Sequence, residues 1–107
     1  MAKQPKFDVL FSPDVVDHLD AIDVKYHSGL KRIIDEQLGH TPDKETRNRK
    51  PLRRPAPFDV SWELRCGPQN SFRVFYKIDF DQRIVGIVAI GVKDRNKLFF
   101  GSEEFKP

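Results

Sequence analysis

Strict alternation of apolar and polar residues marks two segments in the second half of the chain. In residues 58–66 one parity holds Phe58, Val60, Trp62, Leu64 and Cys66, and in residues 71–79 it holds Phe72, Val74, Tyr76 and Ile78. Successive side chains of a strand point to opposite faces, so each segment predicts a strand with one buried face. Residues 67–70 between them, Gly-Pro-Gln-Asn, are typical of a turn. The two segments therefore predict a β-hairpin.

A helical period governs the first half of the chain. Residues 6–11 alternate as a short strand does, and Ser12 with Pro13 then forms a helix start. Apolar residues recur at helical spacing in residues 15–22 and again in a second predicted helix, residues 24–38. Gly39 and Pro42 end that helix. We expect a helical hairpin that packs both apolar stripes on one face of a sheet.

The C-terminal third completes the predicted fold. Residues 83–91 are apolar on both parities, which indicates a central strand, and residues 98–100 form an apolar anchor beyond a basic loop. We expect residues 101–107 to be a flexible tail. The order of elements predicts one α+β domain spanning residues 1–107. In it, an N-terminal strand and a two-helix hairpin pack on one face of a mainly antiparallel four-stranded sheet. The strand at residues 58–66 should run antiparallel to the first.

Composition excludes several classes of protein. No apolar run in the 107 residues approaches the roughly 20 needed to span a bilayer, so no membrane association is expected. The single cysteine, Cys66, has the apolar parity of its strand, which indicates a core side chain and fits a reducing cytoplasm. His18, His27 and His40 lack the spacing of metal ligands, and no glycine-rich phosphate loop occurs. We expect no metal and no cofactor.

Charge is distributed unevenly along the chain. Residues 1–43 hold five Lys/Arg against eight Asp/Glu, a net of −3, whereas residues 44–107 hold fourteen against eight, a net of +6. Residues 44–54 alone carry six positive charges and one negative charge. This run is either solvated surface or a phosphate-binding segment, because basic clusters bind phosphate backbones by releasing condensed counterions. The candidates for phosphate contacts are Arg47, Arg49, Lys50, Arg53 and Arg54.

The polar parity of the predicted hairpin holds the candidate centre. Glu63, Arg65 and Arg73 share this face, and the hairpin register places Arg73 opposite either Arg65 or Glu63. Two guanidiniums on adjacent strands repel unless an anion lies between them. The trio is therefore either a surface ion-pair network or a phosphodiester site, in which arginines stabilise developing charge and the carboxylate accepts a proton. Phe75, on the same parity, is either a platform for an unstacked base or covered by the C-terminal segment.

These residues resemble the RelE/ParE superfamily of toxins from bacterial type II toxin–antitoxin systems. The matching segments are residues 7–14, 62–65, 72–79 and 90–95, in the same element order. The resemblance implies a compact RelE-like α+β toxin, neutralised by a cognate antitoxin protein encoded next to it. Members of the RelE branch cleave mRNA in the ribosomal A site, without a metal, by attack of a 2′-hydroxyl on the phosphate. Members of the ParE branch inhibit DNA gyrase.

The resemblance also assigns roles to individual positions. Arg73 matches the family arginine that contacts the scissile phosphate, Arg65 matches a further basic strand position, and Lys93 or Arg95 matches the basic residues after the last strand. Where RelE nucleases carry two strand lysines, this chain has Ser61 and Glu63, and it has Phe99 and Phe100 in place of a C-terminal tyrosine. Some branches use a glutamate as the base, a role that Glu63 can fill. The resemblance thus implies a cytoplasmic endonuclease of ribosome-bound mRNA. The alternatives are a gyrase inhibitor and a non-catalytic RNA-binding member.

Overall fold

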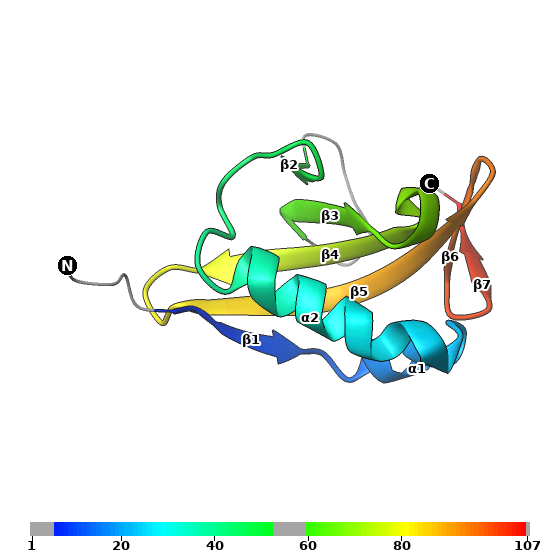
Figure 1. Ribbon diagram of the computed structural model, residues 1–107, viewed down its shortest axis with the longest axis horizontal. Coiled ribbons are helices and arrows are strands. Elements are labelled where there is room, and N and C mark those ends of the chain that lie inside the picture. The colour runs from blue at the N-terminus through cyan, green and yellow to red at the C-terminus, as the bar shows by residue number, and fades with distance from the viewer. Residues whose placement is uncertain (1–5, 53–59, 107) are drawn as a thin grey trace.

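The computed structural model describes residues 6–52 and 60–106, and it has helices on one face of a twisted sheet (Figure 1). The predicted α+β class and the two-helix arrangement are confirmed. The elements, in chain order, are β1 (Asp8–Phe11), α1 (Asp14–Asp20), η1 (Val24–Tyr26), α2 (His27–Leu38), β2 (Arg49–Pro51), β3 (Trp62–Cys66), η3 (Pro68–Asn70), β4 (Phe72–Asp79), β5 (Ile84–Asp94), β6 (Lys97–Phe100) and β7 (Glu103–Phe105). No helix in these described ranges is long and apolar enough to cross a bilayer.

The sheet has seven strands where four were predicted, counting the described residues only. Its order is β2-β3-β4-β5-β6-β7 with antiparallel neighbours, and β1 pairs in parallel with the first half of β5. The prediction that the strand at residues 58–66 runs antiparallel to the first is wrong, because β3 runs in the same direction as β1. The short strand β2, which was not predicted, takes the antiparallel direction before β3.

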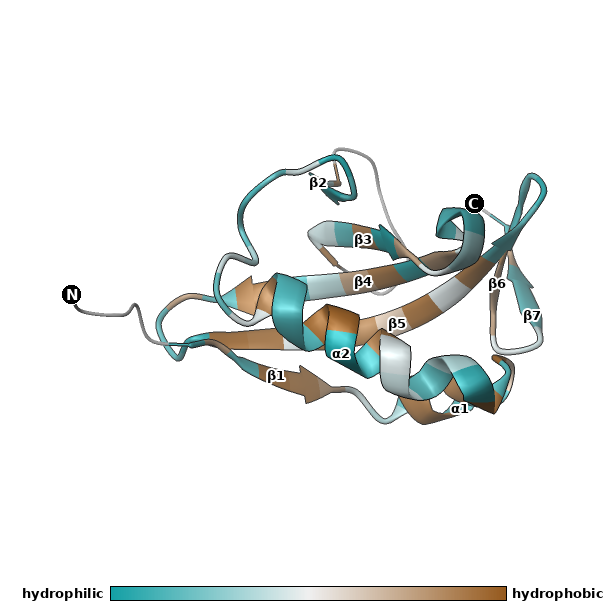
Figure 2. Ribbon diagram, viewed as in Figure 1, coloured by the Kyte–Doolittle hydropathy of each residue, from teal (hydrophilic) through white to brown (hydrophobic). Residues whose placement is uncertain are grey.

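The main core lies between the sheet and the helices, as the strand parity predicted. Its buried side chains include Leu30, Ile34 and Leu38 of α2, and Leu64, Cys66, Phe72, Val74, Tyr76, Val85, Ile87 and Ile90 of the sheet. Figure 2 shows hydrophobic residues along β1, β4 and β5, whereas the segment around β2 is hydrophilic. Trp62 stacks on Tyr76 with ring centroids 6.1 Å apart, and the Tyr76 hydroxyl donates to the Pro42 carbonyl at 2.8 Å. Burial raises the pKa of the Cys66 thiol to about 11, as expected of a core cysteine.

A second, smaller core covers one end of the opposite face of the sheet, which we call the back face. Phe75, Ala89 and Phe100 are buried there, and Leu52, Val60, Leu98 and Phe105 pack against them. Phe75 is therefore covered by the C-terminal strands, the second of the two predicted alternatives. The prediction of a flexible tail is wrong for residues 103–105, which form β7 and pair with β6. Apolar contact of Phe105 with Phe100, 6.1 Å between centroids, holds β7 on the sheet.

Two side chains complete the edge of β5 between β1 and β6. Strand β1 pairs with Ile84 to Ile87, and β6 pairs with Gly91 to Asp94. In the interval, Ser12 Oγ donates to the Val88 carbonyl at 2.8 Å, and the Ile90 N–H donates to His18 Nδ1 at 3.2 Å. His18 is buried on α1, and its ring lies 5.4 Å from that of Phe100. It thus joins α1, β5 and β6.

The structure contradicts one predicted phosphate contact, that of Arg49. It is only 5% exposed, and its Nη1 donates to the carbonyls of Gln37, at 2.7 Å, and Thr41. These carbonyls lie at and beyond the C-terminal end of α2, where helical carbonyls lack intrahelical partners. The predicted phosphate contact is therefore wrong for Arg49, because its guanidinium is used inside the protein to connect β2 with α2.

This packing predicts different outcomes for two neighbouring arginines. Arg49→Ala should lower the free energy of unfolding by about 2 kcal/mol or more, because the charged hydrogen bonds to the Gln37 and Thr41 carbonyls are lost. Arg47→Ala, at an exposed position, should change it by no more than about 0.5 kcal/mol. Denaturant unfolding followed by circular dichroism measures both variants. Equal stability of the two variants would contradict the structural role of Arg49.

The contact of His18 predicts acid sensitivity. Burial lowers the pKa of His18 below its ordinary value of 6.5, against the opposing effect of Asp14 and Asp17. Below pH 6.5 the unfolded chain therefore binds a proton that the folded protein resists, and folding stability falls with pH by up to about 1.4 kcal/mol per pH unit. The loss continues until the pH reaches the folded-state pKa.

Unfolding free energies measured between pH 5 and 7.5 test this account. His18→Gln should flatten the pH slope, because it removes the titrating group. Val24→Gln, at a position that is 77% exposed and carries no titrating group, should leave the slope unchanged. An unaltered slope in His18→Gln would show that other groups cause the acid sensitivity.

Candidate functional site

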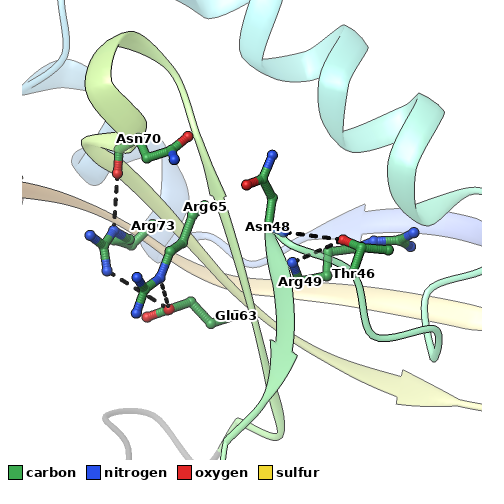
Figure 3. A network of polar contacts seen from close by, with 7 residues as sticks. All are labelled: Thr46, Asn48, Arg49, Glu63, Arg65, Asn70 and Arg73. Carbon is green, nitrogen blue, oxygen red and sulfur yellow. Dashed lines mark hydrogen bonds and ion pairs between the residues drawn. The ribbon is translucent and has the colours of Figure 1, made fainter.

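The candidate site lies on the back face, near the turn that joins β3 and β4. The hairpin register pairs Arg65 with Arg73 and Glu63 with Phe75, which selects the first of the two predicted pairings of Arg73. Glu63 and Arg65 therefore lie on the same face of the sheet as Phe75 and Arg73, the residues opposite them on β4. Figure 3 shows Glu63, Arg65 and Arg73 converging there, while the Arg49 guanidinium lies apart. The structure thus brings together the three residues predicted to form the centre.

One carboxylate oxygen serves both arginines. Arg65 Nε donates to Glu63 Oε1 at 2.8 Å, and Arg73 Nη1 lies 3.8 Å from the same oxygen. The side chains of Glu63 and Arg73 are each 12% exposed, and that of Arg65 is 40% exposed. The ion-pair network considered from the sequence is therefore present. It has two positive charges and one negative charge, so the cluster keeps a net positive charge.

The electrostatics of Arg73 follow from this imbalance. Burial lowers the pKa of its guanidinium, the nearby Arg65 lowers that pKa further, and Glu63 acts in the opposite direction. A further anion close to Arg73 therefore stabilises the charged form of its guanidinium. A phosphate oxygen placed at the exposed side of Arg65 would supply such an anion, since guanidinium groups can bind phosphate with two parallel hydrogen bonds.

A strained turn orients Arg73. Gln69 and Asn70 both have positive φ, 54° and 55°, and the Asn70 carbonyl accepts a hydrogen bond from Arg73 Nε at 3.1 Å. Gly67, with φ of 78°, starts this turn, and a Cβ there would lie 2.2 Å from the Phe72 ring. Only glycine fits that position. The sequence pattern predicted the turn but not the hydrogen bond between Arg73 and the Asn70 carbonyl. The one signal for it in the sequence was the asparagine itself, because asparagine tolerates positive φ better than most residues.

Further basic residues border the cluster. Lys50 pairs with Glu63 across β2 and β3, and Lys93 lies two residues beyond Gly91, the β5 partner of Arg73, so both share the back face and are exposed. Arg95 is exposed in the β5–β6 turn, and Arg47 is exposed before β2. Arg53 and Arg54 lie outside the described residues. Within the described ranges no cluster of His, Cys, Asp and Glu suits a metal ion.

Comparisons with known proteins agree with the fold. The chain is similar to a chain in the crystal structure of the toxin–antitoxin complex RelBE2 from Mycobacterium tuberculosis, with a TM-score of 0.65 and 22% identity. The match covers 82% of this chain and 99% of that chain. No curated protein sequence matches. The family described as "ParE toxin of type II toxin-antitoxin system, parDE" matches residues 9–96, most of the chain. The chain therefore belongs to the ParE toxin family of type II toxin–antitoxin systems.

Proposed function

We propose that this toxin is an endonuclease of ribosome-bound mRNA and that the back-face cluster is its phosphodiester site. The observation that carries the proposal is the direct pairing of Arg65 with Arg73, which share the single carboxylate of Glu63. Like charges placed directly opposite each other destabilise a sheet. An anionic ligand relieves this cost, and the phosphate backbone of RNA is such a ligand.

Each residue of the cluster has a role in the proposed reaction. Glu63 accepts the proton of the 2′-hydroxyl as that oxygen attacks the adjacent phosphorus. Arg73 and Arg65 stabilise the negative charge that develops on the non-bridging oxygens. The P–O5′ bond then breaks, leaving a 2′,3′-cyclic phosphate and a 5′-oxygen that takes a proton from Lys93 or water. The reaction needs no oxidant or reductant.

Inhibition of DNA gyrase is the second candidate, and specific observations favour it. The matching family description is that of a ParE toxin. Phe75 is 3% exposed and offers no platform to a base, and Phe100, 8% exposed, has no hydroxyl. Glu63 already accepts from Arg65, which reduces its capacity to take a substrate proton. A toxin of this kind uses the basic face for binding alone. Both proposed targets lie in the bacterial cytoplasm, where we place the toxin.

Induction of the toxin gene alone separates the two candidates. Transcript integrity and plasmid supercoiling are followed in the same culture. The endonuclease proposal predicts cut transcripts with cyclic-phosphate ends and normal supercoiling. Intact transcripts with altered supercoiling would establish the gyrase candidate instead.

Arg73→Ala tests the phosphate contact. Loss of a group that stabilises transition-state charge typically reduces the rate by about a hundredfold or more. We therefore expect single-turnover cleavage of ribosome-bound message to fall by at least that factor, with the fold retained. Arg95→Ala, which removes a charge from the exposed β5–β6 turn, serves as the matched control and should change the rate less than about tenfold. Full cleavage by a folded Arg73→Ala protein would contradict the assignment.

Glu63→Gln tests the proposed base. Glutamine keeps the shape of the side chain and accepts from Arg65, but it takes up no proton at neutral pH. If Glu63 is the base, the single-turnover rate falls about 10²–10⁴-fold with little change in RNA affinity. If Glu63 only neutralises the arginines, RNA binding tightens and cleavage persists. Unchanged cleavage would therefore reject Glu63 as the base.

A further inference from the structure

A groove of about 620 Å³ lies on the back face, at the turn that joins β4 and β5. Figure 1 shows this turn at the opposite end of the sheet from β6 and β7. Gly86 of β5 pairs with Lys77 of β4, which has the same parity as Arg73. The groove is lined by Lys77, Ile78, Asp79, Phe80, Asp81, Ile84 and Gly86. It therefore opens on the face that carries the arginine cluster.

Gly86 lies in the middle of the groove, between Lys77 on β4 and Leu10 on β1. Neither the backbone nor the packing requires glycine there. Its φ is not positive, and a Cβ would meet its nearest neighbour, Lys77 Cγ, at 3.7 Å, which is an ordinary van der Waals contact. Glycine inside a strand weakens the sheet and often marks a site that a ligand approaches closely. The missing side chain leaves room for an occupant of the groove.

Phe80 supplies an aromatic surface at this groove. It is 58% exposed, and its ring meets the Phe7 ring edge to face, with 6.3 Å between the centroids. The contact with Phe7 orients the ring, while more than half of the residue stays accessible. RNA-binding proteins stack unpaired bases on aromatic side chains. Phe75, the platform predicted from the sequence, is buried, whereas Phe80 is free to take that role.

The polar side chains of the groove suit different parts of a nucleotide. Lys77 is exposed and lies four residues from Arg73 along β4, a distance of about 14 Å at roughly 3.4 Å per residue. Its ammonium group can hold a phosphate of an RNA strand that also reaches the arginine cluster. Asp79 Oδ1 accepts from the Gln82 N–H at 3.0 Å, whereas the exposed carboxylate of Asp81 offers two acceptor oxygens to a ligand.

Two adjacent acceptor oxygens distinguish among the RNA bases. Guanine presents two neighbouring donors on its Watson–Crick edge, N1–H and the N2 amino group, and one carboxylate accepts from both. Uracil presents a single N–H between two carbonyl oxygens, which a carboxylate repels. Adenine and cytosine each present an amino group beside a ring nitrogen that accepts. The groove therefore matches guanine best.

We propose that this groove is a guanine subsite, in which the base stacks on Phe80 over Gly86 and the Asp81 carboxylate accepts from N1–H and the N2 amino group. Lys77 holds a phosphate of the same strand. The inference rests on the proposed function, because the RNA that enters the groove is the RNA bound at Arg65 and Arg73. It makes binding and cleavage depend on a guanine a few nucleotides from the scissile phosphate.

Two uncleavable RNAs measure the base preference. One is a fluorescently labelled 2′-O-methyl oligonucleotide of uridine alone, and the other carries one guanosine, placed in turn at each position. Fluorescence anisotropy with the wild-type protein should give at least about fivefold tighter binding when the guanosine reaches the groove, as expected of a bidentate base contact. Arg73→Ala should weaken the binding of both RNAs.

Matched variants test the residues of the groove. Asp81→Asn should abolish the guanosine preference, because an amide offers one acceptor beside a donor. Asp20→Asn makes the same charge change at an exposed position of α1, on the other side of the sheet, and should retain the preference. Gly86→Ala fills the space under the base and should weaken binding of the guanosine RNA alone. Gly29→Ala on α2, where a Cβ would meet nothing within 4 Å, should change neither affinity. Thermal melting verifies that the four variants fold.

The outcomes separate this proposal from the proposed function. A guanosine preference that survives Asp81→Asn would overturn the subsite. So would equal affinity of the wild type for both RNAs, and if Arg73→Ala still weakens that binding, the arginine cluster keeps its role. Binding of neither RNA by the wild type would overturn both proposals. A wild-type dimer that Gly86→Ala dissociates, with equal affinity for both RNAs, would instead assign the groove to a second copy of this chain.

Discussion

The pairing of β5 along both edges is the constraint on which the rest of the structure depends. Strand β4 runs along one edge, while the other is shared by β1, the side chains of Ser12 and His18, and β6. Both faces of β5 are also covered, by the helical core on one side and by the small Phe75 core on the other. Because β5 fixes the register of β4, it also fixes the face of the sheet on which Arg73 lies.

The arginine cluster is a direct consequence of the core. Val74 and Tyr76 are fully buried under the helices, so Arg73, at the alternate position, must lie on the back face. A slip of one residue would bury two guanidiniums and expose the core, which makes the register strongly specified. The second core ends beside the cluster and leaves Arg65 accessible. The protein therefore holds a net positive centre at the border of an apolar patch, a setting that suits a bound phosphate.

Periodicity predicted the long elements and the central trio, because burial imposes a repeat on many residues at once. It missed three short strands as strands, β2, β6 and β7, which have three or four residues each and are too short to show a repeat. Residues 98–100, most of β6, were predicted only as an apolar anchor. The predicted direction of β3 was wrong because β2, which was not predicted, runs antiparallel to β3 and reverses the chain before β3 begins. The burial of Arg49 could not be read from the sequence either, since its partners are carbonyls near the end of α2. The role of the Asn70 carbonyl likewise arises from backbone geometry.

Binding of an uncleavable RNA at the arginine cluster tests the central claim most directly. A single-stranded RNA with 2′-O-methyl groups, titrated into protein labelled with ¹⁵N, reports on each arginine Nε–H group by NMR. The account predicts that the signals of Arg65 and Arg73 shift in proportion to bound RNA, while that of Arg49, held by the carbonyls of Gln37 and Thr41, stays in place. Saturable RNA binding that leaves the Arg65 and Arg73 signals unmoved would contradict the phosphodiester site.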